Sequence, residues 1–187
     1  MKKFRYVFSI LPALALAFVA GGCILDAFDE ITQNLSIERS FTVSGNTSAL
    51  VTQSGTFRLA DSKVYTDNRD KIKKMQFKAA AFWVTQNTVP SLQGDIILTL
   101  RNTTTGTVLF TKTLSAFRPS DYLGVSAKNL DLTQTEIDAI NAAVSNVDQL
   151  ETLTFTATMA FQNVTPANTQ ATMQASISLV FAMTFNP

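Results

Sequence analysis

Two segments near the end of the chain alternate apolar and polar residues, and this pattern restricts the fold more than any other feature. The apolar positions are Leu153, Phe155, Ala157, Met159 and Phe161 in the first segment, and Met173, Ala175, Ile177, Leu179, Phe181, Met183 and Phe185 in the second. A period of two places apolar side chains on one face of a strand and polar side chains on the other. We therefore predict two long half-buried strands joined by Pro166-Ala167-Asn168.

Further strands are predicted earlier in the chain, at 35–44, 50–59, 73–86, 96–102 and 107–114. The segments 96–102 and 107–114 are predicted to form a hairpin, because the short loop between them, Thr103-Thr104-Thr105-Gly106, contains glycine. In 73–86, alternation places Phe77 and Trp83 on one face and Phe82 on the other. The second half of this segment is apolar on both faces, so both faces need cover.

One helix is predicted near residues 133–146. Thr133 and Glu136 have the spacing of a capping box, and apolar residues follow at helical intervals from Ile137. We expect this helix to cross one end of the fold. The whole pattern predicts an all-β fold, an antiparallel β-sandwich of about seven strands with one helix.

The first 22 residues have the properties of an export signal. Lys2, Lys3 and Arg5 form a positive segment, and an almost wholly apolar run occupies 7–19. This run is shorter than the roughly 20 residues that a transmembrane helix needs, so it predicts a signal peptide rather than a permanent span. Small residues, Ala20-Gly21-Gly22, come directly before Cys23, the only cysteine of the chain.

This arrangement resembles the lipobox of bacterial lipoproteins, although Ala20 stands where that family usually has leucine. The resemblance implies cleavage before Cys23 and attachment of fatty acids such as palmitate to its thiol and new amino group. Isoleucine rather than aspartate follows the cysteine, which in the enteric sorting rule favours the outer membrane. The implied organisation is a signal peptide at 1–22, a lipidated cysteine and tether at 23–34, and a sandwich domain at 35–187.

Charge and cysteine content limit the possible partners. Removal of 1–22 leaves 165 residues, enough for one domain, with 12 basic against 14 acidic residues and a net charge of −2. Such a balance excludes nucleic acid as a main partner, because nucleic-acid-binding domains carry clustered basic charge. No disulfide can form in the sandwich domain, so packing of its apolar residues, which include most of the chain's 14 phenylalanines, must stabilise it.

The residue types also limit catalysis. The chain has no histidine, which excludes Ser-His-Asp and Cys-His nucleophile systems, and it has no phosphate-binding loop or nucleophile-elbow motif. The strand segments 73–86, 96–102 and 107–114 and the two C-terminal strands contain no aspartate or glutamate. We therefore expect no enzymatic activity. Two alternatives stay open: an envelope glycoside hydrolase that uses an Asp/Glu pair, and a carrier of a hydrophobic ligand inside the sandwich.

Two patterns offer candidate binding residues. Asp67, Asn68 and Asp70, with Asp61 nearby, supply the oxygen ligands that calcium prefers, although the same residues are common in caps and turns. Phe82 and Trp83 offer an aromatic surface for a sugar ring or a protein, although core burial is the alternative. Apart from this calcium site and the lipid on Cys23, no cofactor is expected.

Together these features predict a lipid-anchored β-sandwich of the bacterial cell envelope that acts as a non-catalytic binding or structural module. Its expected partners are the membrane, through the anchor, and an envelope protein or a glycan.

Overall fold

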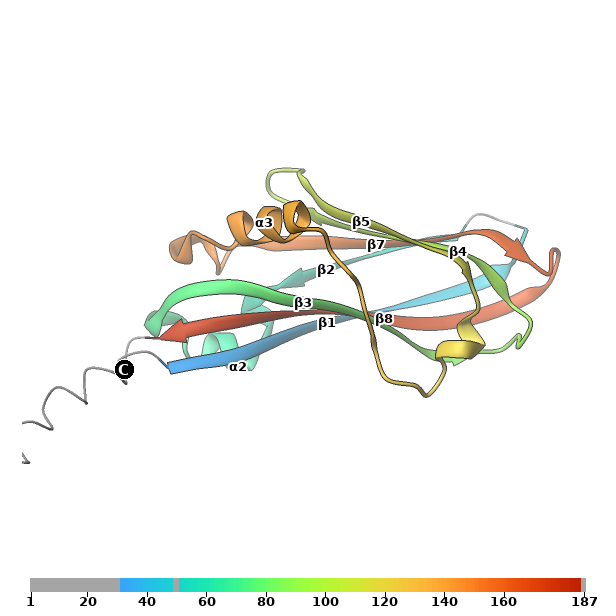
Figure 1. The fold of residues 1–187 in the computed structure, drawn as a ribbon, viewed down its shortest axis with the longest axis horizontal. Coiled ribbons are helices and arrows are strands. Elements are labelled where there is room, and N and C mark those ends of the chain that lie inside the picture. The colour runs from blue at the N-terminus through green and yellow to red at the C-terminus, as the bar shows by residue number, and fades with distance from the viewer. Residues whose placement is uncertain (1–30, 49–50, 186–187) are drawn as a thin grey trace, which may run out of the picture.

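The computed structural model describes residues 31–48 and 51–185, which form two four-stranded antiparallel sheets packed face to face (Figure 1). The predicted all-β antiparallel sandwich is confirmed. The strands are β1 (Ile31–Asn46), β2 (Val51–Arg58), β3 (Ile72–Asn87), β4 (Gln93–Asn102), β5 (Val108–Phe117), β6 (Lys128–Asn129), β7 (Thr154–Thr165) and β8 (Gln170–Phe185). The described residues form eight strands rather than about seven, because the two-residue β6 is too short to leave an alternating pattern.

The strand order is that of a jelly roll. Sheet A has the order β1-β8-β3-β6 and sheet B has the order β2-β7-β4-β5. The pairs β1·β8, β2·β7, β3·β6 and β4·β5 are all antiparallel. The first strand thus pairs with the last and each later pair lies inside the previous one, as in a long hairpin folded over into two layers.

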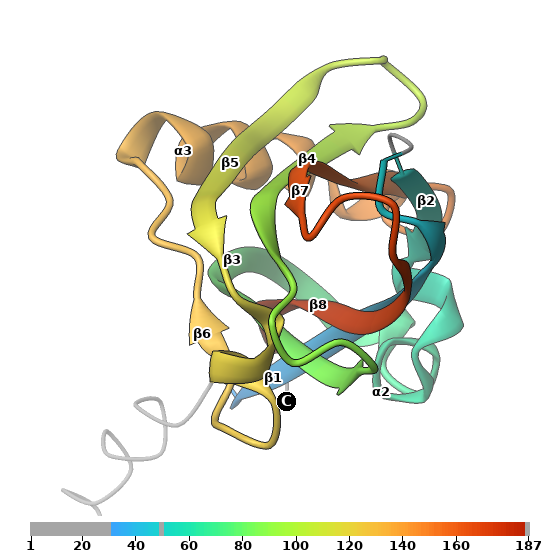
Figure 2. The ribbon, with the colours of Figure 1, turned by 90° about the vertical axis from the view of Figure 1, so that its right-hand side faces the viewer.

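The helical segments are α2 (Lys63–Thr66), α3 (Gln134–Ala143) and the 3₁₀ turns η3 (Leu59–Asp61), η4 (Arg69–Lys71), η5 (Pro119–Tyr122) and η6 (Val147–Gln149). The predicted helix and its capping box are confirmed in α3. The helix was expected to cross one end of the sandwich. Instead it lies along one side, against β3 and β5 (Figure 2). There Asn141 Oδ1 accepts a hydrogen bond of 2.8 Å from the backbone N–H of Phe77, so the helix satisfies a donor on β3.

A β-bulge in β3 changes which side chains share a face. The register of β3 on β8 shifts between Phe77 and Ala79, so Phe77 and Phe82 both point into the core. The strict alternation predicted for this strand, with Phe77 on the face of Trp83, is therefore wrong. Trp83 lies on the outer face of sheet A and is partly exposed.

The other side of the sandwich is bounded by β1 and β2. Alternation along β1 places Arg39 on the apolar face, yet its side chain is exposed and lies across Gly55 of β2. A Cβ at Gly55 would lie 2.6 Å from Arg39 Nε, so the glycine provides the space that the arginine occupies. Arg39 interrupts the apolar pattern of β1, and Gly55 of β2 leaves the space in which its side chain lies.

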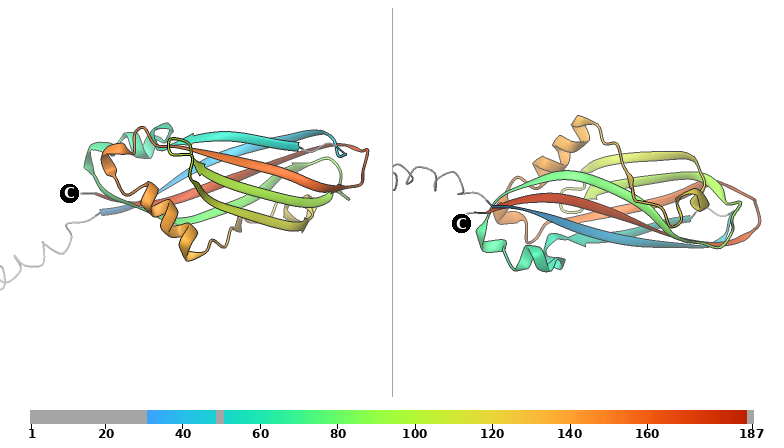
Figure 3. Two further views of the ribbon diagram at one scale, coloured as in Figure 1. Left: turned by 90° about the horizontal axis from the view of Figure 1, so that it is seen from above. Right: turned by 60° about the horizontal axis from the view of Figure 1, so that its bottom comes forward.

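The two ends of the sandwich differ in the segments they carry. Ile31 pairs with Phe185, so the start of β1 and the end of β8 lie together at one end, called here the proximal end (Figures 1 and 3). The β1–β2 and β7–β8 turns lie at the opposite, distal end. β1 begins at Ile31, four residues before the predicted domain start at 35. In the described ranges, no helix has the length and apolar character to cross a bilayer.

Candidate functional site

The structure separates the two aromatic residues that the sequence singled out. Phe82 is fully buried and its ring meets Phe117 edge-on, with 5.7 Å between ring centroids. Its predicted role in ligand binding is therefore wrong, because β3 turns this side chain between the sheets. Trp83 points the other way and is partly exposed on the outer face of sheet A, where it can contact a ligand.

Small polar residues surround Trp83 on this outer face. Trp83 lies opposite Ser176 of β8, which lies opposite Ser40 of β1. Ser176 is only 1% exposed although it faces outward, and its hydroxyl lies 2.8 Å from that of Ser40. Neighbouring side chains, of which Trp83 is the largest, therefore cover Ser176.

The outer face of sheet A is rich in hydroxyl groups. Hydroxyl pairs join β1 to β8 at Ser36–Ser178 (2.7 Å), Ser40–Ser176 (2.8 Å) and Ser44–Thr172 (2.9 Å). In the row next to Trp83, Ala81 lies opposite Ser178, which lies opposite Glu38. Among the described residues, Trp83 is thus a large aromatic group in a face rich in hydroxyl groups.

An aromatic stack fixes the segment that runs beside Trp83. Tyr122 stacks on Phe117 with centroids 4.5 Å apart, and Lys128 Nζ lies 5.5 Å from the centroid of the Tyr122 ring. Leu123 bridges to Val84, the residue after Trp83. Leu123 is 43% exposed, so an apolar side chain extends the surface at this edge of β3.

The predicted calcium ligands are not gathered into one site. Each already has a protein partner: Asp67 pairs with Lys63 (2.6 Å), Asp70 with Arg69 (3.5 Å), Asp61 with Arg58 (2.7 Å), and Asn68 Nδ2 donates to Val64 O (2.9 Å). Within the described part of the chain, no group of three or more acidic, histidine or cysteine residues could hold a metal ion. The structure instead places the three aspartates in ion pairs and Asn68 in a hydrogen bond to a carbonyl of α2.

Two carboxylates line a groove between β1 and β2. Glu38 and Asp61 both line a groove of about 220 Å³. Asp61 Oδ1 accepts hydrogen bonds from Arg58 Nε and Nη2, at 3.2 and 2.7 Å. One of the two acids is therefore held in an ion pair, which does not favour the acid–base pair that a glycoside hydrolase needs.

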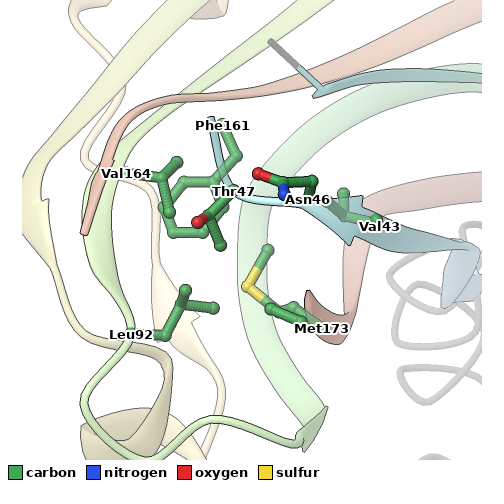
Figure 4. A pocket seen from close by; sticks show the side chains of 9 residues that line it. Val43, Asn46, Thr47, Leu92, Phe161, Val164 and Met173 are labelled. Carbon is green, nitrogen blue, oxygen red and sulfur yellow. The ribbon is translucent and has the colours of Figure 1, made fainter. Parts of the chain in front are cut away.

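A small apolar cavity lies between the sheets at the distal end (Figure 4). Leu92 and Met173 lie on one side of it, and Phe161 and Val164 on another. Its volume is about 20 Å³, which is room for about one water molecule. This cavity is too small for the hydrophobic ligand that a carrier would hold.

A larger hollow opens outside that cavity and shares three lining residues with it: Thr47, Phe161 and Val164. It is wide open to solvent, has a volume of about 710 Å³ and is further lined by Ser48, Gln162, Asn163 and Thr165. None of the described residues that line it carries a charge. Sequence reasoning missed this site, because its two walls come from segments more than 100 residues apart.

The β1–β2 and β7–β8 turns are tied together at this hollow. Thr47 N donates to Thr169 O (2.9 Å), Thr47 Oγ1 donates to Pro166 O (2.6 Å), and Thr169 N donates to Thr47 Oγ1 (3.1 Å). Ser48 Oγ donates to Asn168 Oδ1 (2.8 Å). These bonds hold two turns in one arrangement.

A bulge in β7 shapes the other wall. The register of β7 on β4 shifts between Gln162 and Thr165, and Asn163 there has a φ of 53°. Asp95 of β4 accepts hydrogen bonds from Asn163 Nδ2 (2.6 Å) and from the backbone N–H of Ala116 (2.9 Å), which itself has a φ of 49°. The bond from Asn163, followed by that from Ala116, lowers the pKa of Asp95.

Asp95→Ala is expected to lower the melting temperature, because it removes the acceptor that holds two left-handed residues. The pKa of Asp95 is lowered in the folded state, so its stabilisation is complete above the ordinary aspartate pKa of about 3.9 and is lost as pH falls through the folded value. The difference between parent and variant in thermal unfolding should therefore shrink toward low pH. Asp131→Ala, at an exposed aspartate without a hydrogen bond in the described ranges, is the control. If both substitutions lower the melting temperature equally, Asp95 does not hold the bulge.

Comparisons with known proteins give no family for this chain: no protein-family model matches it, and no curated protein matches it. Among solved structures, the chain is similar to a decameric BFDV capsid protein, with 14% identity over 82% of this chain and 98% of that chain and a TM-score of 0.42. It is also similar to a structure of tobacco necrosis virus, with 12% identity over 81% and 82% and a TM-score of 0.39. A third similar structure, of Desmodium yellow mottle tymovirus, has 12% identity over 83% and 90% and a TM-score of 0.36.

Proposed function

We propose that this chain is a non-catalytic binding module of the bacterial cell envelope, held at the outer membrane by lipid on Cys23. The observation that carries the binding role is the partly exposed Trp83 in a polar face of sheet A. An aromatic ring with nearby hydroxyls suits contact with a protein or a sugar, since it offers apolar area and hydrogen bonds together.

The lipobox-like sequence before Cys23 supports the anchor. A single acyl chain gives only marginal membrane binding, whereas the several chains expected on such a cysteine hold stably. β1 begins eight residues after Cys23, and eight extended residues span at most roughly 28 Å. The anchor thus keeps the proximal end near the bilayer and raises the effective concentration of the module for partners on the same surface.

Cys23→Ala is expected to abolish fatty-acid incorporation and to release the protein from the membrane fraction, because Cys23 is the only cysteine of the chain. The measurement is metabolic labelling with a radioactive or alkyne-tagged palmitate, together with fractionation of the producing bacterium. Ser36→Ala, on the exposed part of β1, is the control and should label like the parent. Equal labelling and equal membrane association of Cys23→Ala would contradict the anchor.

The binding role is tested separately with Trp83→Ala. Capture of envelope proteins and glycans by the parent should be reduced in this variant, while Gln76→Ala on the same outer face should leave it unchanged. Loss of capture by a variant that still unfolds cooperatively, with a melting temperature only a few degrees below that of the parent, supports a contact surface at Trp83. Unchanged capture would remove Trp83 from the site.

A further inference from the structure

We infer that the hollow at the distal end, lined by Thr47, Ser48, Gln162, Asn163 and Thr165 above Phe161 and Val164, is a binding site for a neutral oligosaccharide. This goes beyond the proposed function, because it uses a different part of the molecule from Trp83. It depends on the anchor only for its orientation: the β1–β2 and β7–β8 turns that border the hollow lie at the end opposite to the start of β1 (Figure 1), so an anchored domain would turn the hollow away from the membrane.

The size and shape of the hollow fit a small ligand. Its volume of about 710 Å³ lies within the roughly 300–1,000 Å³ of small-molecule sites. It is more open to solvent than the apolar cavity of about 20 Å³ beside it. An extended ligand can therefore enter from the distal end and rest on the partly exposed Val164, while Phe161 stays in the core.

The lining has hydrogen-bonding groups that are available to a ligand. In the described part of the chain, the side chains of Gln162 and Thr165 have no hydrogen-bond partner. Asn163 donates through Nδ2 to Asp95, which leaves its Oδ1 as an acceptor. Amide and hydroxyl groups that both donate and accept match the hydroxyl groups of a sugar.

The absence of positive charge among the described lining residues selects against anionic ligands. An anion that enters this hollow loses hydration without gaining an opposite charge, which costs free energy, and the Asp95 carboxylate behind Asn163 repels it. A neutral sugar loses less, because its hydroxyls regain hydrogen bonds and its apolar ring face can lie on Val164. The chemistry therefore favours neutral over acidic oligosaccharides.

The framework of the hollow is fixed before a ligand arrives. The bonds from Thr47 and Ser48 tie one turn to the other, and Asp95 holds the bulge at Asn163. Bulges and left-handed residues other than glycine are found preferentially at binding sites, where they direct side chains away from the regular sheet. A preorganised site loses less conformational entropy on binding, which favours affinity.

The test is titration calorimetry of the full-length protein, purified in detergent, with maltohexaose, cellohexaose, xylohexaose, chitohexaose and, as the acidic probe, hexagalacturonate. At least one neutral oligosaccharide should bind more tightly than hexagalacturonate. The double variant Gln162→Ala/Thr165→Val should weaken that binding at least tenfold. Gln76→Ala/Thr113→Val, which makes the same changes at exposed positions outside the hollow, should bind like the parent.

Three results would overturn the inference: no binding of any neutral oligosaccharide, equal binding of hexagalacturonate, or binding that survives the double variant. Gln162→Glu gives a second check, since it keeps the side-chain shape but adds a charge and should also weaken binding. Loss of binding in Trp83→Ala with retention in the double variant would move the sugar to sheet A, which contradicts the inference but supports the proposed function. A failure of the lipid anchor would leave these titrations unchanged.

Discussion

Phe82→Ala is expected to lower the free energy of unfolding by about 3–5 kcal/mol, the usual cost of truncating a fully buried phenylalanine. Phe82 has no exposed surface, and its ring meets Phe117, which in turn stacks on Tyr122. Truncation therefore leaves a void beneath the aromatic stack that holds the segment beside β3. Chemical denaturation at neutral pH measures the change.

Trp83→Ala is the matched control, because it truncates the neighbouring residue on the opposite face. Trp83 is only partly buried. Trp83→Ala should therefore lower the free energy of unfolding by roughly 1–2 kcal/mol, because only part of the side chain's apolar area is buried. A larger cost for Trp83 than for Phe82 would mean that the faces of β3 are reversed.

Glu136→Ala should lower the free energy of unfolding by about 2–3 kcal/mol, because one carboxylate caps α3 and also joins it to β5. Glu136 Oε2 accepts from Thr133 N (2.7 Å), from Thr133 Oγ1 (2.9 Å) and from Lys112 Nζ (2.8 Å). The Lys112 and Glu136 side chains are only 21% and 18% exposed, so solvent screens the pair incompletely. Asp138→Ala, at an exposed position of the same helix, should change stability by less than about 0.5 kcal/mol.

The effect of Glu136→Ala should depend on pH. Burial raises the pKa of Glu136, but the bonds from Lys112 and Thr133 outweigh it and the net pKa is lowered. The stabilisation is therefore complete above the ordinary glutamate pKa of about 4.3 and is lost as pH falls through the folded value. Denaturation of parent and variant from pH 7 downward should show the two curves converging; a constant difference would show that the charge of Glu136 does not contribute. The double variant with Lys112→Ala then measures the share of the ion pair.

The regular elements were predictable because their signals are local. Alternation predicted the strands at 153–161 and 173–185, which the structure extends to Thr154–Thr165 and Gln170–Phe185. The capping residues Thr133 and Glu136 predicted the start of α3. The glycine-containing loop 103–106 predicted the β4–β5 hairpin.

The topology and the bulges were not predictable from such signals. Which strand pairs with which depends on contacts across the whole chain, as in the pairing of Ile31 with Phe185. The bulge after Phe77 leaves no mark in the sequence, because Lys78 and Ala79 are ordinary strand residues, yet it reverses the faces of the residues that follow until the next register shift, after Val84. For the same reason, the position of Trp83 relative to Phe77 was predicted wrongly.

The candidate sites also differ in whether a local sequence signal or a contact between distant segments creates them. Trp83 could be identified because a single tryptophan stands out in any sequence, and only the structure separates it from the buried Phe82. The distal hollow depends on Thr47 meeting Thr169 and on Asn163 meeting Asp95, and both pairings join distant segments. Polar residues such as these predict only turns when they are read one segment at a time.

The most direct test of the proposed function is the intact mass of the protein extracted from the membranes of the bacterium that produces it. The expected mass is that of residues 23–187 plus acyl groups on the N-terminal cysteine. A protein that retains residues 1–22 and carries an unmodified thiol would contradict the anchored module.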